Sequence, residues 1–287
     1  MPHMADIAAA ELFLVSSGRV LDRRRFECLF QDGDPRAVRD AVAAYRTSDG
    51  GFGHGLEPDG RDPASQPGAI EKALHTLHEA DAWDEVLVQS ACDWLERNAP
   101  ERGGVPFVMP TIEKWPHPPW WTPEPGLPPS LIFTGLTAST LHARRVDHDW
   151  LTKATELMWS LIDSLDRPHP YVVRAALRFL EQVPDRERAG AAFDRLGPFV
   201  KDLVTLDPDA GGEAHFPLDF APLPDSPARR YFDGATIERH LEHFENAQHA
   251  DGYWDFNWGH WSPAAEAEWR GMLTVDALVL LRANGRL

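Results

Sequence analysis

Two stretches of the chain share the pattern that decides its fold. They are Arg46-Thr47-Ser48-Asp49-Gly50-Gly51-Phe52 and Gln248-His249-Ala250-Asp251-Gly252-Tyr253-Trp254. Each follows a segment of helical periodicity, carries Asp-Gly and then, after one residue, an aromatic side chain, and leads through a loop into another such segment. A glycine that ends a helix takes the left-handed turn, and the aspartate accepts backbone hydrogen bonds. The pattern predicts repeated hairpins of two helices, with the aromatic side chain packed on helix ends.

The rest of the chain supports an all-α fold. Segments with apolar residues at three- and four-residue spacing, closed by Gly, Pro or Asp, are typical of helices. They cover residues 5–16, 21–30, 36–47, 68–80, 83–97, 130–145, 149–163, 169–182, 186–205, 234–248 and 263–284. The stretch 104–109 is the best extended candidate, and it is short.

Weaker copies of the turn pattern begin at Gly103 and Gly211. Repeated hairpins stack into a ring or a solenoid, so we predict one α/α toroid of about ten to twelve helices. Long loops at 50–68, 100–129 and 207–228 are expected at one end of it. The toroid is expected to span residues 1–287 as a single domain.

The stretch 248–254 resembles the QW repeat of the squalene–hopene cyclase and protein prenyltransferase superfamily. The stretch 46–52 is similar, with Arg46 where the repeat has Gln, and the four copies span about residues 36–287. The resemblance implies an α/α toroid, terpenoid-cyclase-like or prenyltransferase-like, with a cavity for an apolar substrate.

Three catalytic signatures of that superfamily are missing from the sequence. The chain has no Asp-Asp dipeptide, and therefore neither the DxDD acid of class II cyclases nor the DDxxD element that holds Mg²⁺ in class I enzymes. Neither Cys28 nor Cys92 lies two residues after an Asp, as the zinc site of protein prenyltransferases requires. The resemblance is thus to the scaffold.

The loop between Phe52 and the helix expected from Gly68 holds the strongest candidates for catalysis. A carboxyl group in an apolar pocket has a raised pKa and can act as a general acid. The predicted catalytic residues are Glu57, Asp59, Asp62 and His54. Glu57 or Asp59 is the expected acid, oriented by Asp62 and Gln66. The alternative is a structural loop whose carboxylates cap the following helix and are neutralised by Arg61.

Tryptophans supply the second group of candidates. Two loop regions of the chain hold most of the eleven tryptophans. Aromatic faces stabilise cations, stack on sugars or fill a core. The predicted substrate-binding residues are Gln66, Trp120, Trp121, Phe216, Trp258, His260, Trp261 and Glu268. For Trp254, the aromatic residue of the repeat, packing is the favoured role.

Charge and composition exclude several classes of partner. The chain has 45 acidic and 28 basic residues and a formal net charge of -17, which disfavours nucleic acids and anionic membranes. No stretch reaches the ~18 uncharged apolar residues of a membrane span, and no signal peptide is recognisable. The pairs His75/His78 and His240/His243 lack a third-ligand pattern, so no metal or cofactor is predicted. A cytoplasmic location is expected.

These observations predict a terpene-cyclase-like lyase or isomerase, although enzyme activity itself stays open. It would act on an apolar isoprenoid in a Trp-lined cavity by carboxylate acid–base catalysis. One alternative is a carbohydrate-active α/α barrel, whose paired carboxyl groups would lie roughly 5–5.5 Å or 6.5–9.5 Å apart in a hydrolase. The other is a non-catalytic toroid that binds a lipid or a protein.

Overall fold

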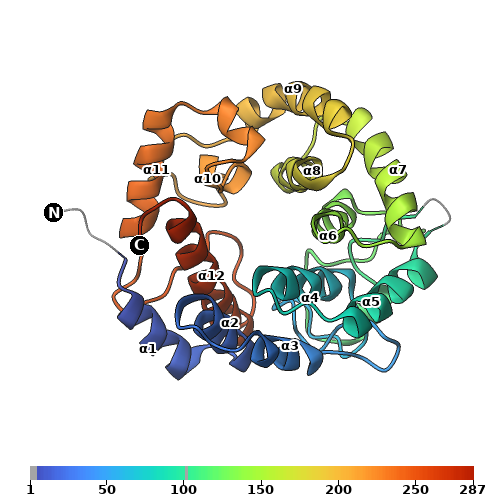
Figure 1. Cartoon of the computed structure of the whole chain (residues 1–287), viewed down its shortest axis with the longest axis horizontal. Helices are drawn as coiled ribbons and strands as arrows, with labels where there is room; N and C mark the ends of the chain where they lie inside the picture. Colours follow the sequence, from blue (N-terminus) through green and yellow to red (C-terminus); the bar gives the residue numbers. More distant parts are fainter. Residues whose placement is uncertain (1–4, 101–102) are drawn as a thin grey trace. The chain divides into compact units, whose positions relative to one another are not determined.

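The structure, a computed structural model, describes residues 5–100 and 103–287, and this part of the chain is all-α (Figure 1). Its α-helices are α1 (Ile7–Ser17), α2 (Val20–Phe30), α3 (Pro35–Ala43), α4 (Pro67–Glu79), α5 (Glu85–Asn98), α6 (Leu131–Ala143), α7 (Asp149–Asp163), α8 (Pro170–Gln182), α9 (Arg186–Leu203), α10 (Pro217–Phe220), α11 (Gly234–Asn246) and α12 (Pro263–Ala283). Two 3₁₀ helices are η1 (Pro110–Lys114) and η2 (Pro227–Tyr231). The predicted all-α class is confirmed.

The eleven expected helices are all present, and the differences are local. Helix α3 ends at Ala43 rather than at 47, because the chain turns there and the Tyr45 N–H donates to the Val42 carbonyl at 3.0 Å. The short helix α10 was not predicted. In the extended candidate 104–109, Pro106 forms one isolated bridge with Pro129, and the described residues contain no strand.

The chain divides into two compact units. Unit 1 comprises Met1–Gly33 and Leu196–Leu287, and unit 2 comprises Asp34–Arg195. The boundary between Arg195 and Leu196 falls inside helix α9, which contributes residues to both units. The single domain expected from the sequence stays a prediction.

Unit 2 is built from paired helices. Helix α6 packs on α4 and α8 along one layer, while α3 packs on α4 and α7 packs on α5 and α6 (Figure 1). Gly135 lets α6 and α7 pack closely, since a methyl group there would lie 2.8 Å from Met158 Cε of α7. These pairings hold the loops between the helices in fixed positions.

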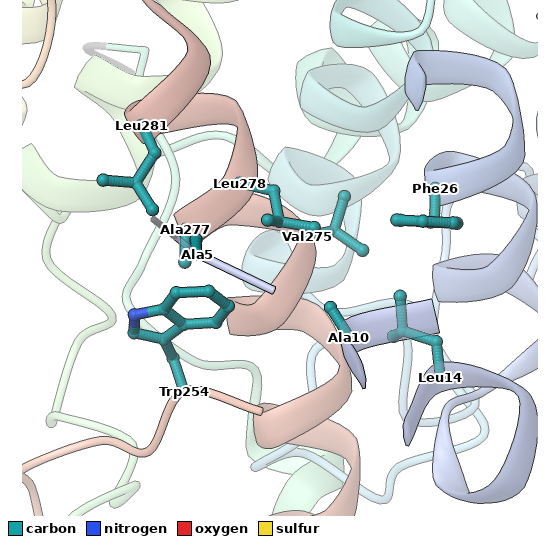
Figure 2. Packing of buried hydrophobic residues seen from close by; sticks show 9 residues of the cluster. All are labelled: Ala5, Ala10, Leu14, Phe26, Trp254, Val275, Ala277, Leu278 and Leu281. Atoms are coloured by element: carbon teal, nitrogen blue, oxygen red, sulfur yellow. The ribbon is translucent and has the colours of Figure 1, made fainter. Parts of the chain in front are cut away.

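Unit 1 brings the two ends of the described chain together. Helix α1 packs on α2 and α12, and α12 also packs on α2. Such a pairing of first and last helices is one that the predicted toroid requires. Trp254 is 2% exposed and lies in the apolar cluster between these helices (Figure 2). Its indole N–H donates to the Phe244 carbonyl at 2.9 Å, which confirms the packing role favoured for this residue.

The two turns that define the repeat have the same hydrogen bonds. Gly50 and Gly252 have φ angles of 97° and 94°. The Gly50 N–H donates to the carbonyl of Thr47 at 3.2 Å, and the Gly252 N–H donates to the carbonyl of His249 at 2.8 Å. A second bond closes each turn, since the N–H groups of residues 47 and 249 donate to the carbonyls of residues 51 and 253. The internal repeat is therefore a structural one.

Replacing Gly252 by alanine is expected to lower the free energy of unfolding by about 3 kcal/mol, because strain and a backbone clash add. A methyl group there would lie 2.1 Å from the carbonyl oxygen of Ala9. Gly212→Ala is the matched control: its φ is 77°, yet a methyl group would meet no atom within 4 Å. Urea unfolding should show a loss of only about 1 kcal/mol for the control. Equal losses in both variants would contradict the clash.

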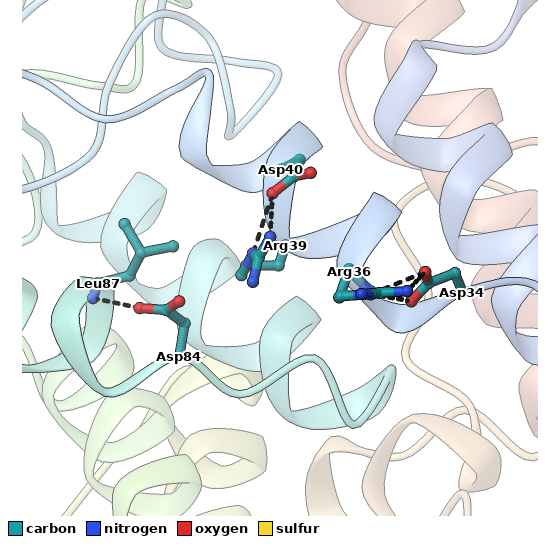
Figure 3. Close-up of polar contacts among 6 residues, drawn as sticks. All are labelled: Asp34, Arg36, Arg39, Asp40, Asp84 and Leu87. Carbon is teal, nitrogen blue, oxygen red and sulfur yellow. Dashed lines mark hydrogen bonds and ion pairs between the residues drawn. The ribbon is translucent and has the colours of Figure 1, made fainter.

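Aspartates begin several helices, as helix-capping physics requires. The Asp34 carboxylate accepts the Arg36 N–H at 2.9 Å at the start of α3 (Figure 3). Asp84 accepts the Leu87 N–H at 3.0 Å at the start of α5. These caps fix where the helices beside the long loops begin.

Within the described ranges, every helix is too short or too polar to cross a bilayer.

Candidate functional site

The loop between the first turn and α4 is closed at its base by backbone hydrogen bonds. The Gln66 N–H donates to the Phe52 carbonyl at 2.9 Å, and the His54 N–H donates to the Asp62 carbonyl at 2.8 Å. His54 and Gly55 take left-handed conformations, with φ angles of 57° and 77°, which reverse the chain. We call residues 54–66 the carboxylate loop.

Most of the carboxylate loop is buried. Glu57 and Asp59 are 5% and 6% exposed, and Asp62 is fully buried. His54 is the exposed member of the four predicted catalytic residues, and it bonds to Asp62 through its backbone N–H. The loop therefore brings three carboxyl groups into the interior, while the imidazole of His54 faces solvent.

Glu57 has an unusual environment for a carboxyl group. Its Oε2 accepts the N–H groups of Asp59 at 2.8 Å and of Gly60 at 3.2 Å. Its Oε1 has no hydrogen bond to the described residues. Burial, reinforced by the negative charge of Asp59, raises the pKa of Glu57 to about 8, against the opposing effects of Lys72 and the two N–H groups. At neutral pH this side chain is mostly a neutral acid.

Asp62 and Gln66 hold the loop in place. Asp62 accepts the Ala64 N–H at 2.8 Å through Oδ1 and the Gln66 amide at 2.7 Å through Oδ2. The Gln66 amide also donates to Thr111 Oγ1 at 3.1 Å, and its oxygen accepts the Met109 N–H at 2.8 Å. Both side chains thus bind protein groups and join the carboxylate loop to the segment that begins η1.

Aromatic rings line one side of the carboxylate loop. Phe107 lies 5.0 Å from Phe133 and 5.6 Å from Trp121 between ring centroids. Two glycines allow close contact, since a methyl group on Gly60 would lie 2.9 Å from Trp121 Cζ3 and one on Gly68 would lie 2.9 Å from Phe133 Cζ. We call Phe107, Trp121 and Phe133 the aromatic wall.

The two neighbouring tryptophans differ sharply. Trp121 is 4% exposed and belongs to the aromatic wall, whereas Trp120 is 48% exposed. Gly68 also contacts the carboxylate loop, because a methyl group on Gly68 would lie 3.4 Å from Glu57 Cγ as well as close to Phe133. Phe133 and Glu57 therefore meet at the start of α4, where the glycine leaves room for both.

Unit 1 contains a separate aromatic cluster, made by Phe256, Trp258, His260 and Trp269. Phe256 stacks on His260 at 4.3 Å between centroids, and Trp258 meets Trp269 edge-on at 5.0 Å. His260 Nδ1 lies 3.3 Å from Glu266 Oε1. Two predicted binding residues, Trp258 and His260, are thus brought together.

The other predicted residues of unit 1 lie in different surroundings. Phe216 contacts the His240 ring at 5.6 Å, and Trp261 is half-buried. Glu268 Oε2 lies 3.9 Å from Arg19 Nη1, and Arg19 also pairs with the buried Asp22 at 2.9 Å. Glu268 thereby belongs to a charged network between α2 and α12.

Two cavities in the described part of the chain have linings that contain none of the predicted residues. One, of about 360 Å³ in unit 2, is lined by Asp93, Glu96, Arg97, His148 and Asp149. The other, of about 350 Å³ in unit 1, is lined by Ala9, Leu12, Phe13, Ser16, Ser17, Ala250 and Asp251. The carboxylate loop is the candidate site, because its buried Glu57 is a carboxylic acid that can donate a proton. Across the described residues, no group of three His, Cys, Asp or Glu side chains is arranged to hold a metal ion.

The site residues predicted from the sequence did not include Lys72, Phe107, Phe133, Phe256 or Trp269. Lys72 follows Gly68 by one helical turn in a segment expected to be helical, so its face could have been inferred. The aromatic wall is joined by contacts between distant segments, which the spacing of residues along the chain does not reveal.

Comparison with known proteins supports the fold. No family model matches the chain, and no curated protein matches it. A crystal structure of a protein from Actinoplanes aligns over 97% of this chain and 89% of its own, with a TM-score of 0.57 and 14% identity. At this identity, the similarity concerns the fold alone.

Proposed function

We propose that the protein is a terpene-cyclase-like enzyme, a lyase or isomerase, in which Glu57 donates a proton to an apolar isoprenoid. The observation that carries the proposal is the buried Glu57 carboxyl group, whose pKa is raised to about 8 by burial beside the negative charge of Asp59. A group whose pKa lies near the working pH holds a proton and can still release it. The substrate class comes from the resemblance of the turns to the QW repeat.

The hydrogen bonds of Glu57 suit such a donor. The two N–H groups at Oε2 favour the carboxylate that remains after transfer, and Oε1 has no partner among the described residues to compete for the proton. An acid of this pKa transfers a proton more readily to an oxygen atom than to an unactivated carbon–carbon double bond. We therefore propose an isoprenoid that carries a hydroxyl or epoxide oxygen.

The carboxylate loop and the aromatic wall supply the groups that the proposed reaction needs. The Glu57 O–H bond breaks and the proton goes to the substrate oxygen. Cleavage of the carbon–oxygen bond then releases water from an alcohol, or opens an epoxide to a hydroxyl group, and leaves a cation on the substrate carbon. An aromatic face gives ~2 kcal/mol of stabilisation to a cation that is shielded from water. The Glu57 carboxylate can take a proton from the neighbouring carbon, which forms a double bond and restores the acid.

The surrounding charges favour an uncharged substrate. Asp59 is buried beside Glu57, and its negative charge acts on the Glu57 carboxyl group. A diphosphate would meet these carboxyl groups. The proposal includes a cytoplasmic location, which the presence of only two cysteines favours.

A substrate screen tests the function. The protein is incubated with free oxygenated isoprenoids, polyprenyl diphosphates and oligosaccharides, and product formation and thermal shift are measured in parallel. Conversion of a free isoprenoid is the expected result. Cleavage of an oligosaccharide would favour a carbohydrate-active enzyme, and a thermal shift without product would favour a binding protein. No response to any of the three classes would contradict the proposal.

A further inference from the structure

Lys72 lies on α4 close to the candidate acid, and the proton transfer proposed above gives it no role. Gly68, where Glu57 and Phe133 meet, is four residues earlier in the same helix, and residues at this spacing lie on one face. The Lys72 side chain is 26% exposed, and its Nζ lies 3.5 Å from Glu71 Oε2. Its long stem therefore starts one turn beyond the point where Glu57 packs on the helix.

The charges that act on Glu57 come from two elements. Asp59, on the carboxylate loop, disfavours a negative charge on Glu57, and Lys72, on α4, favours it. Glu71, beside Lys72, is 5% exposed and draws on the same ammonium group. Lys72 is thus shared by acidic residues, and because the Glu57 carboxyl group is buried, solvent screens it less from the Lys72 charge.

We propose that Lys72 is a positioning residue for the proton transfer, whose ammonium group stabilises the Glu57 carboxylate left behind when the proton has moved to the substrate. This inference rests on the proposed role of Glu57. Only the proton changes partner in the step: the electron pair of the broken O–H bond stays on Glu57, and Lys72 keeps its own protons. Without the ammonium group, Glu57 would hold its proton too tightly.

The test follows the titration of Glu57 directly. The carboxyl ¹³C shifts of glutamate-labelled protein are recorded against pH, and the Glu57 signal is assigned by its loss in Glu57→Gln. Lys72→Met is expected to raise the pKa of Glu57 by about one unit, because an opposite charge nearby favours the charged form. Lys72→Arg keeps the positive charge, so it should shift the pKa of Glu57 from its wild-type value by less than about half as much as Lys72→Met does.

Lys114→Met is the matched control, because it removes the same charge from an exposed position in unit 2. It is expected to leave the Glu57 titration unchanged. Lys72→Gln serves as a second neutral variant if Lys72→Met does not fold. An unchanged Glu57 titration in both neutral variants, or an equal change in Lys114→Met, would overturn the role of Lys72.

The same experiment separates this inference from the proposed function. If Glu57 of the wild-type protein titrates at the ordinary glutamate value, the proposed acid itself fails. If the pKa of Glu57 is raised but does not change when Lys72 is replaced, only the role of Lys72 fails. With a substrate in hand, Lys72→Met should lower turnover about three- to tenfold and move the alkaline limb of the pH profile upward, whereas Lys72→Arg should restore both.

Discussion

Glu57→Gln is expected to reduce turnover of the isoprenoid substrate by a factor of about 10²–10⁴ while leaving the fold intact, the range that a lost general acid commonly costs. Glutamine keeps the shape of the neutral carboxyl group, and its amide oxygen can still accept the N–H groups of Asp59 and Gly60. What it lacks is a proton that can leave. Circular dichroism and urea unfolding would establish the fold, and initial rates would give the loss.

Two other carboxyl groups serve as controls for this result. Glu113→Gln changes an exposed residue of η1 and should keep full activity. Asp59→Asn removes the neighbouring charge that raises the pKa of Glu57. It is expected to shift the alkaline limb of the pH profile to lower pH. Full activity in both Glu57→Gln and Asp59→Asn would reject the assignment of the acid to this loop.

The second large effect concerns stability. The difference in unfolding free energy between wild type and Glu57→Gln is expected to change by about 4 kcal/mol from pH 5 to pH 9, in favour of the variant at high pH. Burial and the Asp59 charge raise the pKa of Glu57 from 4.5 to about 8 in the folded protein. The unfolded chain therefore releases this proton at lower pH than the folded protein does.

The direction follows from this difference in protons bound. The contribution of Glu57 to stability is fully present below pH 4.5, decreases as the pH rises, and is lost once the pH passes about 8. Urea unfolding of both proteins at pH 5, 7 and 9 measures it. Parallel pH dependences for the two proteins would show that Glu57 is ionised in the folded state.

Much of the fold was open to prediction because its signals are local. The Asp-Gly turns at residues 49–50 and 251–252 need a left-handed glycine, and the structure has one at each place. Helical periodicity located eleven of the helices in the described chain. Helix α10 was not predicted, because its four residues are too few to show helical periodicity. It is held by the Asp219 carboxylate, which accepts the Phe216 N–H at 2.8 Å.

The candidate site was only partly predictable. Composition singled out the carboxylate loop, since several carboxyl groups lie close together in sequence there. It could not separate Trp120 from Trp121, whose exposures differ twelvefold, because that depends on which indole packs against Gly60. Nor could it show that His54 faces solvent, which follows from the left-handed reversal of the chain at that residue. Lys72 was missed because its importance comes from a carboxyl group on another element.

The Gln248 side chain joins the two ends of unit 1. Its amide bonds to both the N–H and the carbonyl of Asp6, at 2.7 and 2.9 Å, and also to the Gly252 carbonyl at 3.0 Å. During synthesis on the ribosome, the side of helix α1 that packs on α12 therefore stays uncovered until the last hairpin has been made. Unit 2 comes from one continuous segment and can acquire its structure while translation proceeds. Unit 1 is expected to form last, by a slow closure that joins Asp6 and Gln248, which are 242 residues apart in the sequence.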